Sequence, residues 1–416
     1  MTEATRELER SIRGLNWTYA LIGAADATLL PYIPLYLAER RLGILEIGVV
    51  LAVAAAGWFV AGLAWAYLAD RTGKPEGAVI AASAAAAAAS LLLPLSGSAV
   101  GLGALIAILF IARAPFAMLD PITLQRLRET SRTRYARIRL RMSGGWAVAA
   151  IISGAGYQIA GLKLMPFVYA VLVAVFGLWA WRTLRPSAAQ RAPVELATTI
   201  TPRGFSTVSL AMLGFSGACL LLGVSSAAAQ NFVTLRINFL GGGALLIGAA
   251  AAFQAVTEIP TMGFTHVLTR RFSNGALFAV GCAIFAAVFL AWAVVTNPVA
   301  LALLKFVTGI GFALTYVAAV LITDELWPAR LRATGQLVIK SVMFGLAPIA
   351  GSFGGGYVYD TYGPGAMFVL SAVLMGAAGI GAMLAVPARR DVKKVEMPSV
   401  PIVIRPEPAA AVLEKR

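Results

Sequence analysis

The chain has 416 residues, of which 59% are hydrophobic and only 13% are charged. A soluble globular protein is about half apolar and a quarter charged, so this composition indicates a membrane protein. Its two cysteines exclude a small scaffold held together by disulfides. The net charge of +15 would suggest a nucleic-acid partner in a soluble protein, whereas in a membrane protein it reports which side the loops face.

Twelve apolar stretches are long enough to cross a bilayer, which takes about 20 residues in a helix. They cover residues 15–38, 44–69, 78–95, 102–123, 142–160, 164–183, 205–232, 244–268, 276–296, 299–323, 333–359 and 366–386. Backbone groups find no water partner in lipid, so stretches of this length predict helices, not a β-barrel. We therefore expect an all-α integral membrane protein with twelve transmembrane helices.

The longest interior polar stretch, residues 185–204, follows the sixth predicted helix and is rich in arginine and proline. It divides the chain into two bundles of six helices, residues 15–184 and 205–386. Residues 1–14 are predicted to be a cytosolic N-terminus, and the charged, proline-rich residues 387–416 a flexible cytosolic tail.

The distribution of basic residues predicts the orientation in the membrane. If the N-terminus is cytosolic, the outer loops contain only Arg40, Arg41, Lys163 and Arg236, and nearly all other basic residues of loops and tails face the cytosol. Cytosolic loops carry an excess of Lys and Arg. We therefore expect both termini to be cytosolic and the protein to lie in a cell membrane, the inner membrane of a bacterium.

A charged motif lies between the second and third predicted helices. Asp70, Arg71, Gly73 and Lys74 stand at the spacing D-R-x-G-K, which resembles the signature of the major facilitator superfamily. The resemblance implies two pseudo-symmetric six-helix bundles that enclose a cavity and alternate its access between the two sides. It also implies that these four residues contribute to gating and to contact between the bundles.

Further motifs resemble the lactose-permease-like and phenylpropionate-permease-like symporters of that superfamily. They comprise Pro31 to Leu37, Asp120 with Pro121, Tyr135 to Arg139, Trp146, and Glu258 with Pro260. In the lactose permease a carboxylate of helix four pairs with the second arginine of an R-x-R motif, and a tryptophan stacks on the sugar. The resemblance assigns these roles to Asp120, Arg139 and Trp146.

The chain also departs from the lactose permease. Lys305 in the tenth predicted helix matches a lysine of that protein, but Thr308 and Gly311 stand where the permease has its proton-handling histidine and glutamate. The seventh helix has no aspartate to pair with Lys305. The proton route of the lactose permease therefore does not transfer to this chain.

Ionisable residues inside transmembrane segments are functional candidates, because a charge at the bilayer centre costs about 2.5–3.5 kcal/mol. Asp26 and Glu258, near the middle of helices one and eight, are the candidates for proton coupling, since a carboxyl in an apolar cavity can exchange a proton near neutral pH. The candidates for substrate binding are Arg113, Asp120, Arg139, Trp146, Lys305 and Lys340.

Several of these residues have two open interpretations. Asp120 and Arg139 form either a structural clamp between helices four and five or part of the cavity lining. Arg113 either binds a substrate carboxylate or neutralises Asp120, seven residues later on the same helical face. Trp146 either packs between helices or contacts the substrate.

These features predict a secondary active transporter, most simply a proton symporter that imports a small polar or anionic organic solute. A proton-coupled efflux antiporter for drugs or metabolites is the alternative, and a non-transporting membrane scaffold or receptor is a third. We expect no enzyme activity, cofactor, metal site or nucleic-acid partner, because the chain lacks a nucleophile–base pair, a metal-ligand cluster and a phosphate loop. The expected partners are the solute, protons and the lipid bilayer, with the protein acting as a monomer.

Overall fold

The computed structural model of the protein describes residues 3–127, 132–184, 209–328 and 331–386, and all regular structure in these segments is helical. The predicted loop 185–204 and the predicted tail 387–416 lie outside the described residues. The longer helices are α1 (Glu3–Leu29), α3 (Ile44–Thr72), α4 (Pro75–Leu92), α5 (Ala99–Arg113), α7 (Arg132–Ala160), α8 (Met165–Thr183), α9 (Leu210–Phe239), α10 (Ala244–Arg271), α11 (Asn274–Val294), α13 (Lys305–Leu326) and α15 (Ala347–Ala385).

Among the described residues, ten segments are long and apolar enough to cross a membrane. The last of them contains 52 residues and is two spans, because Gly363 interrupts the helix with a φ of 84° and Pro364 follows it. The helix α7 is a further span of 29 residues, whose first turns carry Arg137, Arg139 and Arg141. The twelve predicted spans are therefore present.

Four of the spans have an irregular segment in their interior. In the first span, α1 continues through the 3₁₀ turn η1 (Leu30–Tyr32) into α2 (Ile33–Glu39), and in the fourth, α5 continues through η3 (Ala114–Met118) into α6 (Leu119–Arg126). Proline removes a backbone donor and favours such breaks, and Pro31, Pro34 and Pro115 lie at these two.

The other two irregular spans lie in the second half of the chain. Leu304 separates α12 (Pro298–Leu303) from α13, and the π-helix η8 (Val342–Leu346) joins α14 (Arg332–Ser341) to α15. A π-helix widens the backbone by one residue per turn and is often found at functional sites. These breaks change the rotation of the side chains that follow them.

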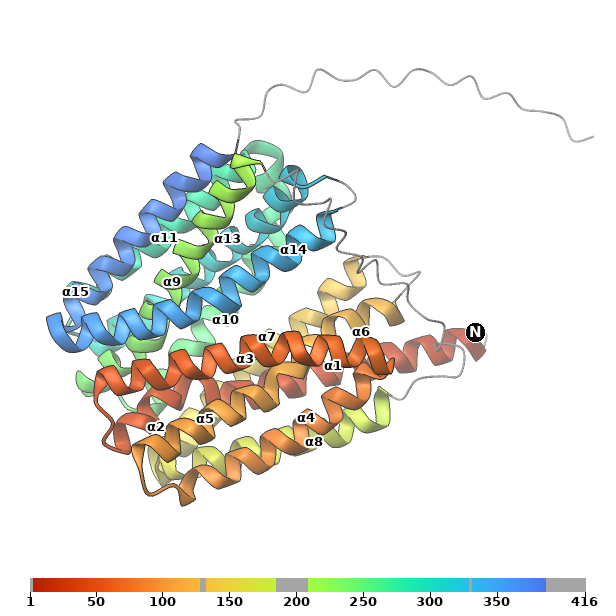
Figure 1. Ribbon diagram of the computed structural model, residues 1–416, viewed down its shortest axis with the longest axis horizontal. Coiled ribbons are helices and arrows are strands. Elements are labelled where there is room, and N and C mark those ends of the chain that lie inside the picture. Colours follow the sequence, from red (N-terminus) through yellow and green to blue (C-terminus); the bar gives the residue numbers. More distant parts are fainter. Residues whose placement is uncertain (1–2, 128–131, 185–208, 329–330, 387–416) are drawn as a thin grey trace, which may run out of the picture.

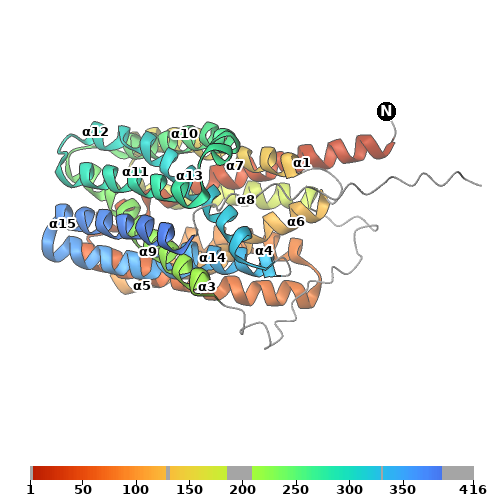
Figure 2. The same cartoon turned by 90° about the horizontal axis from the view of Figure 1, so that it is seen from above.

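The helices form two groups that follow the order of the chain (Figure 1). In the first group α1 packs on α7 and α8, α4 on α8, and α3 on α5. In the second, α9 and α11 pack on α15, and α10 and α11 pack on α13. The groups meet mainly through two helix pairs, α7 with α10 and α3 with α15 (Figure 2).

Both of these helix pairs cross where a glycine allows close approach. A Cβ atom on Gly48 of α3 would lie 2.7 Å from the carbonyl oxygen of Ser352 and 2.9 Å from Cα of Gly356, both in α15. A Cβ atom on Gly248 of α10 would clash with the carbonyl oxygen of Ala150 in α7. Small residues at these points bring the backbones of the two groups into contact.

Two tyrosines fill the space beside these crossings. The Tyr32 hydroxyl donates to the carbonyl oxygen of Ala150 at 2.8 Å, and the Tyr157 hydroxyl donates to that of Thr28 at 3.0 Å. Their rings meet edge to face with centroids 4.9 Å apart. We call the Gly48 and Gly248 crossings and these two tyrosines the closed end of the molecule.

Candidate functional site

An ion pair joins α6 to α7. Nη1 of Arg139 donates to both carboxylate oxygens of Asp120, at 3.0 and 3.1 Å, and the Tyr19 hydroxyl of α1 donates to Oδ1 of Asp120 at 2.8 Å. The side chains of Arg139 and Asp120 remain 43% and 28% exposed. The structure thus brings together the two residues that the resemblance pairs, and leaves the pair accessible from outside the protein.

Glu258 approaches this pair from the other group of helices. It is partly buried on α10, and the charge of Arg139 acts on it electrostatically. The contact follows from the antiparallel packing of α7 and α10, because Ala150 meets Gly248 at one point and Arg139 lies near Glu258 three turns away along both helices. Arg139 therefore pairs with a carboxylate of its own group and interacts electrostatically with a carboxylate of the other.

Asp26 and Arg113 form a second, buried ion pair. Nη2 of Arg113 lies 2.6 Å from Oδ1 of Asp26, with side chains only 8% and 11% exposed. The rings of Phe110 and Tyr169 flank the guanidinium at 5.4 and 5.9 Å from their centroids. Aromatic faces stabilise a cation in such a position, so the pair is enclosed within the first group of helices.

Arg113 and Asp120 do not pair with each other, although they are seven residues apart in the fourth span. The interpretation that Arg113 neutralises Asp120 assumed a continuous α-helix, in which residues seven apart share a face. The 3₁₀ segment η3 lies between them, and three residues per turn instead of 3.6 rotate Asp120 away from Arg113. The structure gives each of the two residues a partner on another helix.

Lys305 is buried at the first turn of α13. Its ammonium group donates to Oε1 of Gln230 in α9 and, at 3.3 Å, to Oε1 of Gln254 in α10, and it lies 5.6 Å from the ring centroid of Trp292. Neither glutamine was predicted from the sequence to belong to a site. The lack of an aspartate in helix seven was a usable signal, because a buried lysine without an acid needs neutral acceptors.

The remaining two substrate candidates differ in burial. Trp146 is partly buried on α7, one turn before Ala150. Lys340 is exposed in the last turn of α14, directly before the π-helix η8. Trp146 lies on the same face of α7 as Arg139 and Ala150, since these residues are spaced by seven and four.

The charged motif lies at the turn between α3 and α4. Gly73 ends α3 in the left-handed region with a φ of 62°, its N–H donates to the carbonyl oxygen of Ala69 at 2.8 Å, and Pro75 starts α4. Glycine adopts this φ without strain, which explains its place in the motif. Arg71 is exposed and donates to the Tyr67 hydroxyl at 3.4 Å. The side chain of Asp70 lies outside the described part of the structure, and Lys74 is exposed.

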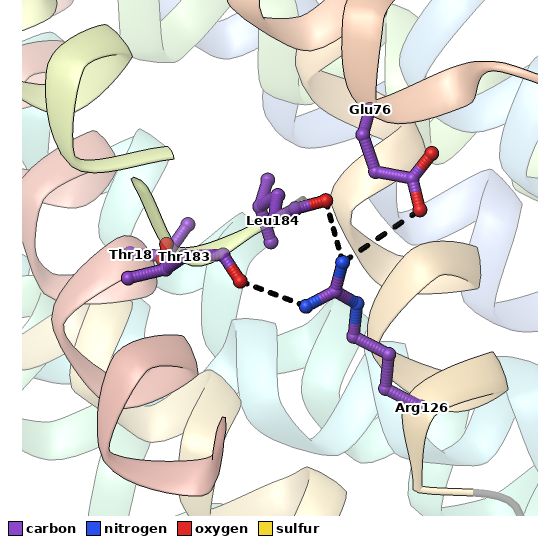
Figure 3. Close-up of polar contacts among 5 residues, drawn as sticks. All are labelled: Thr18, Glu76, Arg126, Thr183 and Leu184. Carbon is purple, nitrogen blue, oxygen red and sulfur yellow. Dashed lines mark hydrogen bonds and ion pairs between the residues drawn. The ribbon is translucent and has the colours of Figure 1, made fainter. Parts of the chain in front are cut away.

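A clamp that the sequence analysis missed lies near this turn (Figure 3). Arg126, the last residue of α6, donates to the carbonyl oxygens of Thr183 at 2.8 Å and Leu184 at 2.6 Å, and lies 3.7 Å from Glu76 of α4. The last carbonyls of a helix lack intrahelical donors and carry partial negative charge, so an arginine stabilises them. The clamp connects α4, α6 and the end of α8.

The residues that the structure describes contain no group of three or more histidine, cysteine or acidic side chains that could hold a metal ion. Its two cysteines, Cys219 and Cys282, are buried and free. Six charged residues form ion pairs between different helices, namely Asp26 with Arg113, Glu76 with Arg126, and Asp120 with Arg139. A multi-pass bundle of membrane-spanning helices in two packed groups, with charges at their junction, is the architecture of a membrane transporter.

Comparison with known proteins defines the family. The family model described as MFS_1 like family matches residues 13–370. This chain therefore belongs to the MFS_1 like family of the major facilitator superfamily, as the motifs predicted. The maltose permease of Geobacillus stearothermophilus is 28% identical over 359 residues, which is 85% of this chain and 89% of that protein. These relatives are transporters, not enzymes.

Solved structures share the fold. The crystal structure of the nucleoside transporter NupG superposes with a TM-score of 0.76 at 16% identity, and covers 92% of this chain and 99% of that chain. A mutant of the same transporter superposes with a TM-score of 0.77, again at 16% identity, over 91% of this chain and all of that chain. At this identity the likeness is one of fold.

Proposed function

We propose that this transporter is a proton symporter that imports a small polar or anionic organic solute by alternating access. The observation that carries the proposal is the position of Arg139. It pairs with Asp120 in one group of helices and lies within electrostatic reach of Glu258 in the other. A charge shared between the two groups can couple protonation to their relative movement.

The coupling follows from the competition for Arg139. While Glu258 is ionised, it attracts Arg139 and holds α10 against α7. When Glu258 binds a proton, this attraction ends, Arg139 stays with Asp120, and one ionic contact between the groups is lost. Protonation also removes a charge from the site, which lowers the free energy of moving the loaded site through an occluded, water-poor state.

The other candidates have different proposed roles. Trp146 and the Asp120–Arg139 pair lie on the accessible part of α7 and α6, and we assign them to the solute site. Asp26 has Arg113 as a close, buried partner, so we assign this pair to the stability of the first helix group. Lys340, exposed beside η8, is assigned to the entrance of the site.

The proposal predicts the effect of replacing Glu258 by glutamine. Glu258→Gln removes the exchangeable proton but keeps the shape of the side chain. Uptake driven by a proton gradient should fall to background, while exchange of labelled for unlabelled solute, which needs no net proton movement, should persist. Both are measured in proteoliposomes with maltose, uridine, glucuronate and 3-phenylpropionate as trial solutes and with the pH set separately on each side.

The matched control is Glu39→Gln, because Glu39 is an exposed carboxylate at the end of α2. It should leave both uptake and exchange unchanged. Gradient-driven uptake that survives in Glu258→Gln would contradict the assignment of the proton site. If the protein is oriented as in the cell and a gradient that is acidic inside the vesicle accelerates solute uptake, the protein is an efflux antiporter instead.

The placement in the cell is part of the same proposal. The excess of basic residues in alternate loops supports cytosolic termini and insertion in the inner membrane of a bacterium. Asp70, Arg71, Gly73 and Lys74 then lie on the cytosolic side and would regulate opening there. Each protein molecule contains both helix groups, so a monomer is sufficient for transport.

A further inference from the structure

We propose that Gln230 and Gln254 bind a carboxylate group of the transported solute, and that Lys305 positions both amides for this. The inference rests on the proposed function, because it completes the solute site of that transporter. Three charged residues are buried among those that the structure describes, namely Asp26, Arg113 and Lys305. The first two neutralise each other. Lys305 is the one with no carboxylate beside it.

The hydrogen bonds of Lys305 determine how the two amides are oriented. An ammonium group only donates, so it selects the oxygen of each glutamine amide. The nitrogen of each amide must then point away from Lys305. A carboxamide nitrogen carries two N–H donors, so the two side chains present four donors on the side opposite the lysine.

These donors are available to a ligand. Neither amide nitrogen donates a hydrogen bond within the described part of the chain. Neither is among the buried atoms without a partner, so both nitrogens are accessible to solvent. Gln230 and Gln254 themselves are only partly buried. Gln254 lies four residues before Glu258, so the two side chains share one face of α10. The amide donors therefore face the same space as the proposed proton site, one helical turn nearer to the closed end.

The balance of charge identifies the ligand group. Asp120 and Arg139 cancel, and Glu258 is neutral when it has bound its proton. Lys305 then leaves the loaded site with a single positive charge, which a solute with one carboxylate would neutralise. Amide N–H groups backed by a cation form charge-assisted hydrogen bonds with carboxylate oxygens. A neutral solute would leave the buried charge of Lys305 uncompensated in the occluded state.

Binding to the purified full-length protein tests this inference without a proton gradient. Two pairs of compounds that differ in one carboxylate serve as probes: glucuronate with glucose, and 3-phenylpropionate with 3-phenylpropanol. We expect at least one carboxylate to bind. Its neutral counterpart should bind more weakly, by a factor of about ten or more in the dissociation constant. Titration calorimetry at constant pH gives the dissociation constants.

The variants Gln254→Glu and Gln230→Glu separate ligand binding from folding. Each substitution keeps the shape of the side chain and gives Lys305 an ionic partner, so the protein should fold with an unchanged or higher melting temperature. The new carboxylate has no donors and repels the ligand, so binding of the carboxylate probe should weaken roughly tenfold or more. Lys305→Arg should retain binding, because arginine also only donates.

Gln158→Glu is the matched control, since Gln158 accepts from the backbone N–H of Leu245 at the exposed surface, and glutamate can still accept there. It should bind the probes like the wild type. Three results would overturn the inference: a neutral probe that binds as tightly as its carboxylate, wild-type binding by Gln254→Glu, or no binding of either carboxylate. Failure of proton coupling with intact carboxylate binding would instead refute the proposed function and leave this site standing.

Discussion

At the scale of single residues, two of the ion pairs of the first helix group, Asp26 with Arg113 and Asp120 with Arg139, differ in their surroundings. Arg113 and Asp26 are enclosed, and Nε of Arg113 has no hydrogen-bond partner among the residues that the structure describes. Arg139 and Asp120 are 43% and 28% exposed. Breaking a buried pair leaves an uncompensated charge, whereas an exposed pair exchanges partners at little cost in free energy. The first pair is thus suited to stability and the second to switching.

This difference predicts the effect of Asp26→Asn. The substitution leaves the guanidinium of Arg113 buried without a counter-charge, so the free energy of unfolding should fall by about 3–5 kcal/mol. Thermal unfolding of the purified protein measures the loss as a lower melting temperature. The double variant Asp26→Asn with Arg113→Gln removes both charges and should recover part of the loss, which a double-mutant cycle quantifies.

Asp360→Asn is the control for this cycle, because Asp360 is exposed on α15 and should tolerate the change. If Asp26→Asn were as stable as the wild type but lost proton-driven uptake, Asp26 would be the coupling carboxylate in place of Glu258. The melting temperature and the proton-driven uptake together therefore decide whether Asp26 or Glu258 is the coupling carboxylate.

At the scale of helices, close backbone contact decides where the two groups touch. Gly48 of α3 meets Ser352 and Gly356 of α15, and Gly248 of α10 meets Ala150 of α7. A contact between bare backbones separates without disrupting interlocked side chains, which suits an interface that opens and closes. Larger residues at these positions would hold the helices apart.

The variant Gly48→Val tests this role of the closed end. Its side chain would force α3 and α15 apart, because a Cβ atom there already lies 2.7 Å from the carbonyl oxygen of Ser352. Ser153, buried beside Tyr32, should then become accessible from the closed end. Replacing Ser153 by cysteine, with Cys219 and Cys282 changed to alanine, allows maleimide labelling to report this opening.

Gly354→Val is the matched control on α15, because a Cβ atom at Gly354 would meet nothing within 4 Å. Labelling of the cysteine at position 153 should stay slow in this control and rise in Gly48→Val. Equal labelling of both variants would show that the glycine contact does not hold this end closed.

At the scale of the whole molecule, the two helix groups and the excess of basic residues on one side determine how the protein can work. The predicted orientation places the Arg126 clamp (Figure 3) and the Gly73 turn at the cytosolic side, and the closed end outside. The structure is then closed towards the outside, with Asp120 and Arg139 accessible. Rocking of the two helix groups that separates the closed end would expose the site to the other side.

The orientation itself can be measured with reporter fusions after Val386. A green fluorescent protein fused there should fluoresce, because it folds in the cytosol, and an alkaline phosphatase at the same point should be inactive. Fusions between Arg40 and Gly43, in an outer loop, should give the opposite pattern. An active phosphatase after Val386 would reverse the predicted topology.

The sequence predicted the spans well but not the irregular segments within them. All twelve spans follow from local runs of apolar residues, and the ends differ by a few residues, as where the predicted span 205–232 corresponds to α9, Leu210–Phe239. The fourth span, predicted as the continuous stretch 102–123, contains a 3₁₀ segment that rotates Asp120 away from Arg113.

The candidate site was predicted as a set of residues, without most of its contacts. Motif resemblance placed Asp120 beside Arg139, and the structure has this pair. The partners of Asp26 and Lys305 were not predicted, because Arg113, Gln230 and Gln254 lie on other helices, and no local pattern reports the rotation of one helix against another. Glutamine is also uncharged, so charge complementarity to Lys305 does not indicate it.

The sequence alone therefore determined that this chain is a membrane protein with twelve spans and a strongly basic side. Hydropathy and charge are local properties of the sequence. A long apolar segment in lipid forms a helix because its backbone groups can be hydrogen-bonded only within the segment. Only the tertiary structure decided that the handful of charges in the membrane form a sealed pair, an accessible pair and a lysine held by two amides. Those outcomes depend on helix rotation and crossing points, which packing between distant segments sets. The +15 net charge indicates orientation, and these few inner charges carry the proposed function.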